Sequence, residues 1–191
     1  KDEVIYPAPY WVSYPEMAKL AGGVGVAVVP EDGSFQPSVP DIADKVGSYT
    51  KAIILNSPNN PSGVMYSRDF VAEIVAFCEK KSLWLVMDDL YNRLVFDGQK
   101  APNPFDFAKV TGEASKLVVV QGVSKMYAMT GFRIGYACGP TELIEAMMKI
   151  HQYSMLCASI ISQEAALEAI LHGEPLVAPA PTIVCSSSTK R

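Results

Sequence analysis

LVVVQGVSKMYAMTGFRIGY, residues 117–136, joins an apolar run to a lysine and an arginine. Residues 117–120 have the composition of a buried β-strand, and Lys125 follows that run by five residues. An ammonium beside a buried strand needs a partner or a chemical function, because burying an unpaired charge is costly. In such a place desolvation and neighbouring cations favour the free amine, which forms a Schiff base with a carbonyl compound. Arg133, eight residues further on, suits a phosphate group.

Outward from this stretch, apolar runs alternate with segments of helical periodicity. The three runs expected to form buried strands are residues 52–55, 83–87 and 117–120. The best-defined helix is predicted over residues 68–80, with Ser67 as its N-cap. This alternation predicts an α/β fold in which helices cover both faces of a mainly parallel sheet, giving three layers.

The polar residues that follow these strands are expected to meet at one place. Asn60, Asp88 and Lys125 each lie zero to five residues beyond the end of their own strand. Ligands of parallel sheets bind at the carboxyl ends of the strands. The pattern therefore predicts that an amide, an acid and an amine project from the same edge of the sheet.

The rest of the chain predicts further elements and one irregular end. Further strands are expected at 3–6, 24–29 and 134–138, and further helices at 15–21, 41–46, 142–153 and 162–172. Thr141 is expected to cap the helix that follows it, and Gly173 to end the last helix. Residues 97–115 are expected to form a connection with one short helix, and residues 174–191, rich in Pro, Ala and Ser, an irregular tail.

Size and charge favour a globular protein that binds a small molecule. The 191 residues are 49% hydrophobic and 19% charged, which is enough for one substantial core. A net charge of -4 leaves no basic footprint for nucleic acid or an acidic membrane surface. We expect no transmembrane span and no signal peptide, because the apolar runs are short and the chain starts with charged residues.

The cysteines and histidines argue against a metal site. The four cysteines are widely spaced, no CxxC pair occurs, and there are two histidines. We interpret the cysteines as reduced thiols, mostly buried, in a cytoplasmic protein. His151 and His172 are interpreted as solvated helix residues.

Four motifs together resemble one enzyme family. Ser124-Lys125 followed by TGFR at 130–133 resembles the lysine signature of the class I/II aminotransferases, which are fold type I enzymes that use pyridoxal 5'-phosphate (PLP). The other three motifs, in the same order as in the family, are PYWVSY (9–14) for the YWxxY part of PxYWxxY, NSPNNPSG (56–63) for NPxNPTG and DDLYNRLVF (88–96) for DExYxxxxF. PYWVSYPEM (9–17) most resembles the branch that contains aspartate and prephenate aminotransferases.

The resemblance implies three catalytic residues. Lys125 would hold PLP as a Schiff base and then move the proton from the substrate's Cα to the cofactor. Asp88 would keep the ring nitrogen protonated, which makes the ring an electron sink. Tyr91 would hydrogen-bond the phenolic oxygen.

It also implies four residues that only bind the cofactor. Trp11 would stack on the pyridine ring, and Asn60 would hydrogen-bond the phenolic oxygen. Ser124 and Arg133 would bind the phosphate. Two positions depart from the family pattern. The family usually has a serine three positions before the lysine, which is Gly122 here, and the second acid of DExY is Asp89.

The same resemblance sets the expected extent and function. The match runs from about residue 3 to about residue 171, so residues 1–173 are expected to be the central part of the PLP-binding large domain, which is incomplete. The implied activity is transfer of an amino group between an amino acid and a 2-oxo acid, of the aspartate or glutamate type, by a homodimer. Two alternatives remain open: another PLP reaction on the same scaffold (lyase, decarboxylase or acyltransferase), or a PLP-binding effector domain of a transcription regulator.

Overall fold

A single six-stranded sheet forms the centre of the computed structural model, which describes residues 1–30 and 33–177. The strands are β1 Glu3–Pro7, β2 Val24–Val28, β3 Thr50–Asn56, β4 Trp84–Asp88, β5 Leu117–Gly122 and β6 Gly135–Cys138. Their order in the sheet is β2-β1-β3-β4-β5-β6. All neighbouring pairs are parallel except β5 and β6, which are antiparallel.

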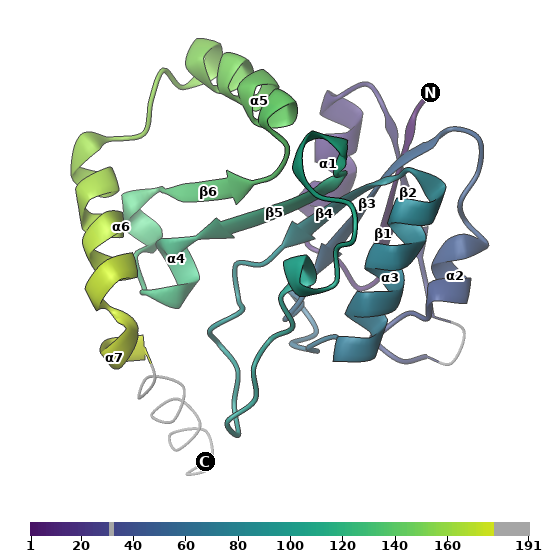
Figure 1. The fold of residues 1–191 in the computed structure, drawn as a ribbon, viewed down its shortest axis with the longest axis horizontal. Helices are drawn as coiled ribbons and strands as arrows, with labels where there is room; N and C mark the ends of the chain where they lie inside the picture. The colour runs from purple at the N-terminus through teal and green to yellow at the C-terminus, as the bar shows by residue number, and fades with distance from the viewer. Residues whose placement is uncertain (31–32, 178–191) are drawn as a thin grey trace.

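Helices connect the strands and extend beyond the last one. The α-helices are α1 Ser13–Leu20, α2 Val39–Ala43, α3 Arg68–Lys81, α4 Val123–Met126, α5 Thr141–Ser154, α6 Ile160–His172 and α7 Glu174–Val177. Three short 3-10 turns are η1 Pro104–Asp106, η2 Gly112–Ala114 and η3 Thr130–Phe132. Figure 1 shows α5, α6 and α7 beyond β6, on the side of the sheet away from β2.

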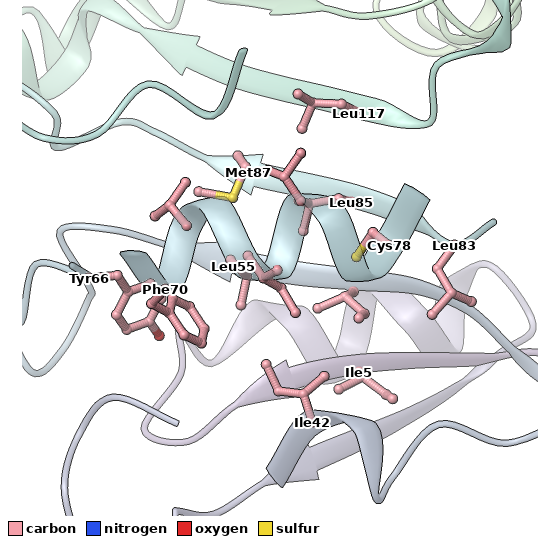
Figure 2. Packing of buried hydrophobic residues seen from close by; sticks show 14 of the residues in the cluster. Ile5, Ile42, Leu55, Tyr66, Phe70, Cys78, Leu83, Leu85, Met87 and Leu117 are labelled. Atoms are coloured by element: carbon pink, nitrogen blue, oxygen red, sulfur yellow. The ribbon is translucent and has the colours of Figure 1, made fainter. Parts of the chain in front are cut away.

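The two faces of the sheet are covered by different helices. Ile5 of β1 belongs to the large apolar cluster that also contains Ile74 of α3 (Figure 2). Its neighbour Tyr6 points to the opposite face, because side chains alternate along a strand, and its ring contacts Tyr14 of α1. Helix α1 therefore covers one face and α3 the other. This confirms the predicted α/β fold with a mainly parallel sheet and helices on both sides.

The larger core lies between the sheet and α3. Ile53 of β3 is completely buried in this cluster. Replacing Ile53 with alanine is expected to lower the free energy of unfolding by about 2–5 kcal/mol, because the deleted methyl groups leave a cavity. The same change at Ile150, which is 73% exposed on α5, should cost less than about 0.5 kcal/mol. Urea unfolding of both variants measures the difference, and equal losses would contradict this description of the core.

Helix α3 follows the pattern read from the sequence. The Ser67 side chain accepts a hydrogen bond from the Phe70 backbone N–H at 3.2 Å, which confirms the predicted N-cap. The helix ends at Ser82, whose backbone is left-handed with a φ of 55°. Lys80 and Lys81 lie in the last turn, where positive charge is favourable.

Helix α5 starts differently from the prediction. Thr141 is the first helical residue, and the N-cap is Pro140, which makes no side-chain capping hydrogen bond. The carboxylate of Glu113 takes that place by accepting hydrogen bonds from the backbone N–H groups of Thr141 and Glu142, both at 3.2 Å. The prediction was wrong because Glu113 comes from a separate segment, the turn η2, which local sequence does not bring to the helix.

Three other predictions need correction. Helix α2 starts at Val39 instead of residue 41, because Ser38 and Asp41 form a capping box. The connection 97–115 contains two 3-10 turns and no α-helix. The tail expected to be irregular from residue 174 begins with α7, and residues 178–191 lie outside the described residues.

The cysteines are less buried than expected. Cys78 is buried in α3, but Cys138 and Cys157 are exposed, and these three described cysteines form no disulfide. Cys138 is exposed because it ends the edge strand β6, and Cys157 because it lies in the connection between α5 and α6. Within residues 1–30 and 33–177, no helix combines the length and the apolar character that a membrane span requires.

Candidate functional site

The carboxyl ends of β3, β4 and β5 lie side by side. Asn56 at the end of β3 pairs with Asp88 at the end of β4, and Asp88 pairs with Val120 of β5. Helix α4 follows β5 directly and carries Lys125, and Asn60 lies four residues beyond β3. The structure therefore places the residues that carry the amide, the acid and the amine at the same edge of the sheet. Figure 1 shows α4 directly beyond the end of β5.

Asp88 uses one carboxylate oxygen and leaves the other open. Its Oδ2 accepts a hydrogen bond of 2.6 Å from the Tyr14 hydroxyl. Its Oδ1 is buried and has no hydrogen-bond partner among the described residues. Burial raises the pKa of Asp88, although the hydrogen bond from Tyr14 acts in the opposite direction. The site therefore contains a partly desolvated acid with one unused acceptor.

This unused oxygen fits the predicted cofactor. Buried polar atoms are nearly always hydrogen-bonded, so a buried carboxylate oxygen without a donor is a place for a ligand's donor. A protonated pyridine nitrogen offers one N–H and a positive charge, which a buried carboxylate stabilises. Asp88 is therefore chemically suited to the ring nitrogen of PLP.

An asparagine that was not predicted to belong to the site connects Asp88 to Asn60. Asn56 is 2% exposed. Its Nδ2 donates to the Asp88 backbone carbonyl at 2.8 Å, and its Oδ1 accepts from the Asn60 backbone N–H at 2.6 Å. The Asn60 side chain in turn donates to the Tyr91 hydroxyl at 3.3 Å. These contacts hold Asp88, Asn60 and Tyr91 together. Asp88 is the residue expected at the ring nitrogen of PLP, and Asn60 and Tyr91 are those expected at its phenolic oxygen.

Trp11 reaches the same group of residues through Tyr14. The two rings are 5.8 Å apart between centroids and meet edge to face at 86°. Trp11 is 40% exposed, so a large part of its ring remains available to a flat ligand. Its placement is compatible with stacking on a ring bound at Asp88.

Lys125 differs from the expectation in its environment. Its side chain is exposed and makes no hydrogen bond or ion pair within the described part of the chain. Helix α4 buries Val123 and Met126 and leaves Lys125 exposed, so the preceding strand does not cover the lysine. Lys125 lines a mainly apolar groove of about 530 Å³, which also includes Tyr127 of the following turn and His172 of α6.

The residues predicted to bind phosphate surround a tight turn. Thr130 Oγ1 donates to the Ser124 carbonyl at 3.0 Å, and the Arg133 guanidinium donates to the Thr130 carbonyl at 3.1 Å. Arg133 has a φ of 53° and Ala128 a φ of 55°. Non-glycine residues in this conformation are uncommon and often lie at binding sites. In this structure, the Arg133 guanidinium is occupied by a hydrogen bond to the backbone of the turn that contains it.

Packing explains why a glycine precedes the lysine. A Cβ at Gly122 would lie 2.9 Å from the Leu90 side chain and 3.2 Å from the Ile134 carbonyl. A serine there would have to displace Leu90, so its phosphate contact is not available in this chain.

The second acid of the motif, Asp89, forms a separate network. It is 5% exposed, and its Oδ2 accepts hydrogen bonds from Gln121 at 2.6 Å and Asn92 at 2.7 Å. Gln121 accepts a further bond of 2.7 Å from Tyr136 of β6. This chain of contacts ties the ends of β4, β5 and β6 together behind the candidate site.

Asp89 makes a pH-dependent contribution to stability. Burial raises its pKa from 3.8 to about 6, so its folded-state pKa lies above the unfolded value. Its contribution is therefore most favourable below pH 3.8 and is lost as the pH rises through about 6. The unfolding free energy of the parent, relative to that of Asp89→Asn, should fall by about 2–3 kcal/mol between pH 4 and pH 7. Urea unfolding at several pH values measures it, and a constant difference would contradict it.

Two residues of the site, Tyr14 and Asn56, were not found from the sequence. Tyr14 lay in the recognised aromatic cluster, and Asn56 at a predicted strand end, but neither position indicates a hydrogen bond to a residue more than 30 positions away. From the sequence pattern alone, only the face of the sheet that the helix of Tyr14 covers could have been inferred.

Comparison with known proteins gives a consistent result. The sequence profile described as "Aminotransferase class I and II" matches residues 1–180. A probable aspartate/prephenate aminotransferase of Thermus aquaticus is 40% identical over 179 residues, covering 93% of this chain and 45% of the relative. The aspartate/prephenate aminotransferase of Cereibacter sphaeroides is 45% identical over 175 residues, covering 88% of this chain and 42% of the relative.

The fold agrees with these relatives. The crystal structure of the aspartate aminotransferase from Rhizobium meliloti superposes with a TM-score of 0.88 at 34% identity, covering 95% of this chain and 45% of that chain. The chain thus spans less than half the length of the relatives that it matches.

Proposed function

The chain belongs to the class I and II aminotransferase family, and from this we propose that the protein transfers an amino group between an amino acid and a 2-oxo acid with PLP as its cofactor. The observation that carries the proposal is the buried, unpartnered Oδ1 of Asp88. It lies at the strand edge where parallel α/β folds bind ligands. Residues 1–173 are proposed to be the central part of the PLP-binding domain.

Bound PLP supplies an electron sink for the pair of electrons left at the substrate's Cα when its proton is removed. The Asp88 carboxylate would hold a proton on the ring nitrogen by charge pairing. Tyr91 and Asn60 would donate to the phenolic oxygen, and their mutual hydrogen bond of 3.3 Å keeps the two donors adjacent. Trp11 would cover one face of the ring and exclude water from it.

Lys125 would carry the covalent and proton-transfer steps. Its Nζ is free of ion pairs with the described residues, so no salt bridge has to break before it reacts. The amine of Lys125 would hold the cofactor covalently, with the carbonyl oxygen leaving as water, and in its free form it would be the base that accepts the Cα proton. Arg133 and Ser124 would bind the phosphate. For this, the Arg133 guanidinium must leave the Thr130 carbonyl.

The substrate is proposed to be of the aspartate or glutamate type, and the site of action the cytoplasm. The relatives in Thermus aquaticus and Cereibacter sphaeroides are named for aspartate and prephenate, which supports the first proposal. The free thiols of Cys78, Cys138 and Cys157 support a reducing compartment.

A homodimer is proposed from the family, and a second subunit or the remainder of a longer chain would cover the exposed apolar side chains on and between α5 and α6. Among them are Ile150 at 73%, Tyr153 at 88%, Leu156 at 80% and Ile161 at 72% exposure. Monomeric proteins rarely leave such a group in water. Sedimentation velocity of the full-length protein should give twice the monomer mass, and a monomer at all concentrations would contradict the proposal.

A half-reaction assay tests the activity. The full-length protein loaded with PLP is mixed with single amino acids, and the conversion of each to its 2-oxo acid is measured. We expect stoichiometric conversion of aspartate or glutamate and recovery on addition of a 2-oxo acid. Release of ammonia or CO₂ instead would identify a lyase or decarboxylase, and no conversion despite PLP binding would overturn the proposal.

A further inference from the structure

Tyr14 makes a buried hydrogen bond at the centre of the candidate site. The residue is 4% exposed and lies in α1, whereas Asp88 is the last residue of β4. Its hydroxyl donates to Asp88 Oδ2 at 2.6 Å, across 74 residues of sequence. A bond to a carboxylate of this length is charge-assisted and stronger than a neutral one.

This bond fixes which carboxylate oxygen remains open. The terminal torsion of an aspartate is broad, so an unrestrained carboxylate can turn either oxygen toward a ligand. With Oδ2 held by Tyr14, Oδ1 is the oxygen left without a partner among the described residues. Burial and the neighbouring Asp88 charge raise the pKa of Tyr14 far above its usual value, so the hydroxyl remains a donor throughout the physiological range.

The same ring also holds Trp11. Tyr14 and Trp11 meet edge to face with centroids 5.8 Å apart. Tyr6, which is 3% exposed, packs on the other side of Tyr14 at 6.2 Å and limits its movement. Tyr14 therefore contacts the acid expected at the ring nitrogen and the aromatic expected on the ring face.

We propose that Tyr14 is a positioning residue that fixes the Asp88 carboxylate and the Trp11 ring relative to one another for a pyridine ring. The inference rests on the proposed function, since it assigns Tyr14 to the same PLP site. Tyr14 itself touches no reacting atom in this arrangement and acts through Asp88 and Trp11.

Tyr14→Phe tests the hydroxyl while keeping the ring that supports Trp11. We expect the full-length variant to bind PLP about tenfold more weakly than the parent, from the loss of one charge-assisted hydrogen bond. Tyr6→Phe is the matched control, because it also removes a buried hydroxyl on this face but no bond to Asp88. Its affinity should equal that of the parent.

A spectroscopic measurement separates positioning from general loss of structure. The pH midpoint of the visible absorption change of the PLP-bound protein should move upward in Tyr14→Phe and not in Tyr6→Phe. The reason is that the Asp88 carboxylate becomes a stronger hydrogen-bond acceptor when Tyr14 no longer donates to it, and it then takes a larger share of the ring nitrogen's proton. The lysine-bound nitrogen then becomes more basic. In an Asp88→Ala background, which has no acceptor for the Tyr14 hydroxyl, Tyr14→Phe should have no further effect on either quantity.

The outcomes distinguish the two proposals. If the parent does not bind PLP, the proposed function fails and the role of Tyr14 fails with it. If the parent binds PLP but Tyr14→Phe matches it in affinity and midpoint, only the role of Tyr14 is overturned. An equal loss from Tyr14→Phe in the parent and in the Asp88→Ala background would also overturn it, because Tyr14 would then not act through Asp88.

Discussion

Replacing Lys125 with alanine is expected to abolish covalent attachment of PLP. With the parent protein, borohydride should reduce the Schiff base and leave a stable label on Lys125, which peptide mass spectrometry locates. Without the amine no such bond forms, and amino transfer should fall by at least about 10²–10⁴-fold from loss of the base alone.

Because Lys125 is exposed, this substitution tests the chemistry of the amine without a large effect on folding. Its side chain is exposed and without ion pairs to the described residues, so the alanine variant should lose less than about 0.5 kcal/mol of stability. Lys149→Ala on α5 is a suitable control, because Lys149 is also exposed but lies away from the strand ends. The same amount of covalent label in Lys125→Ala as in the parent would show that another amine holds the cofactor.

Asp88→Asn is expected to give the second large effect. The variant keeps the shape of the side chain and an oxygen that can accept from Tyr14, but it removes the charge that would keep the ring nitrogen protonated. We expect amino transfer to fall by at least about 100-fold, comparable to the loss of one preorganised electrostatic group in other enzymes.

Stability should not fall with this activity. Burial raises the pKa of Asp88, so the folded protein carries a cost for its charge that asparagine does not have. Asp88→Asn should therefore unfold at the same or a higher urea concentration than the parent at pH 7. The exposed Asp106→Asn is the control for charge removal alone. A fully active Asp88→Asn variant would mean that the carboxylate is not required at the ring nitrogen.

The parts predicted well from the sequence are those set by local pattern. Apolar runs gave β3, β4 and β5, and the Ser67 cap gave the start of α3, because strand and helix periodicity are properties of neighbouring residues. The shared strand edge of Asn60, Asp88 and Lys125 follows from the same pattern, since parallel strands end on one side.

The parts not predicted depend on contacts between distant segments. The Glu113 carboxylate at the start of α5, the Asn56 bonds and the Tyr14 bond to Asp88 each need the path of the whole backbone. The exposure of Lys125 was also missed, because it depends on how α4 packs, with Val123 and Met126 buried and Lys125 facing outward. Short sequence motifs identified the candidate residues, but the contacts of each residue depend on the tertiary structure.

A crystal structure of the PLP-bound protein tests the central claim most directly, through the distance from the ring nitrogen to Asp88 Oδ1. We predict a charge-assisted hydrogen bond of about 2.7–2.9 Å, with the cofactor's carbonyl carbon bonded to Lys125 Nζ. A ring nitrogen that faces solvent or another side chain, with Asp88 Oδ1 still unpaired, would contradict it.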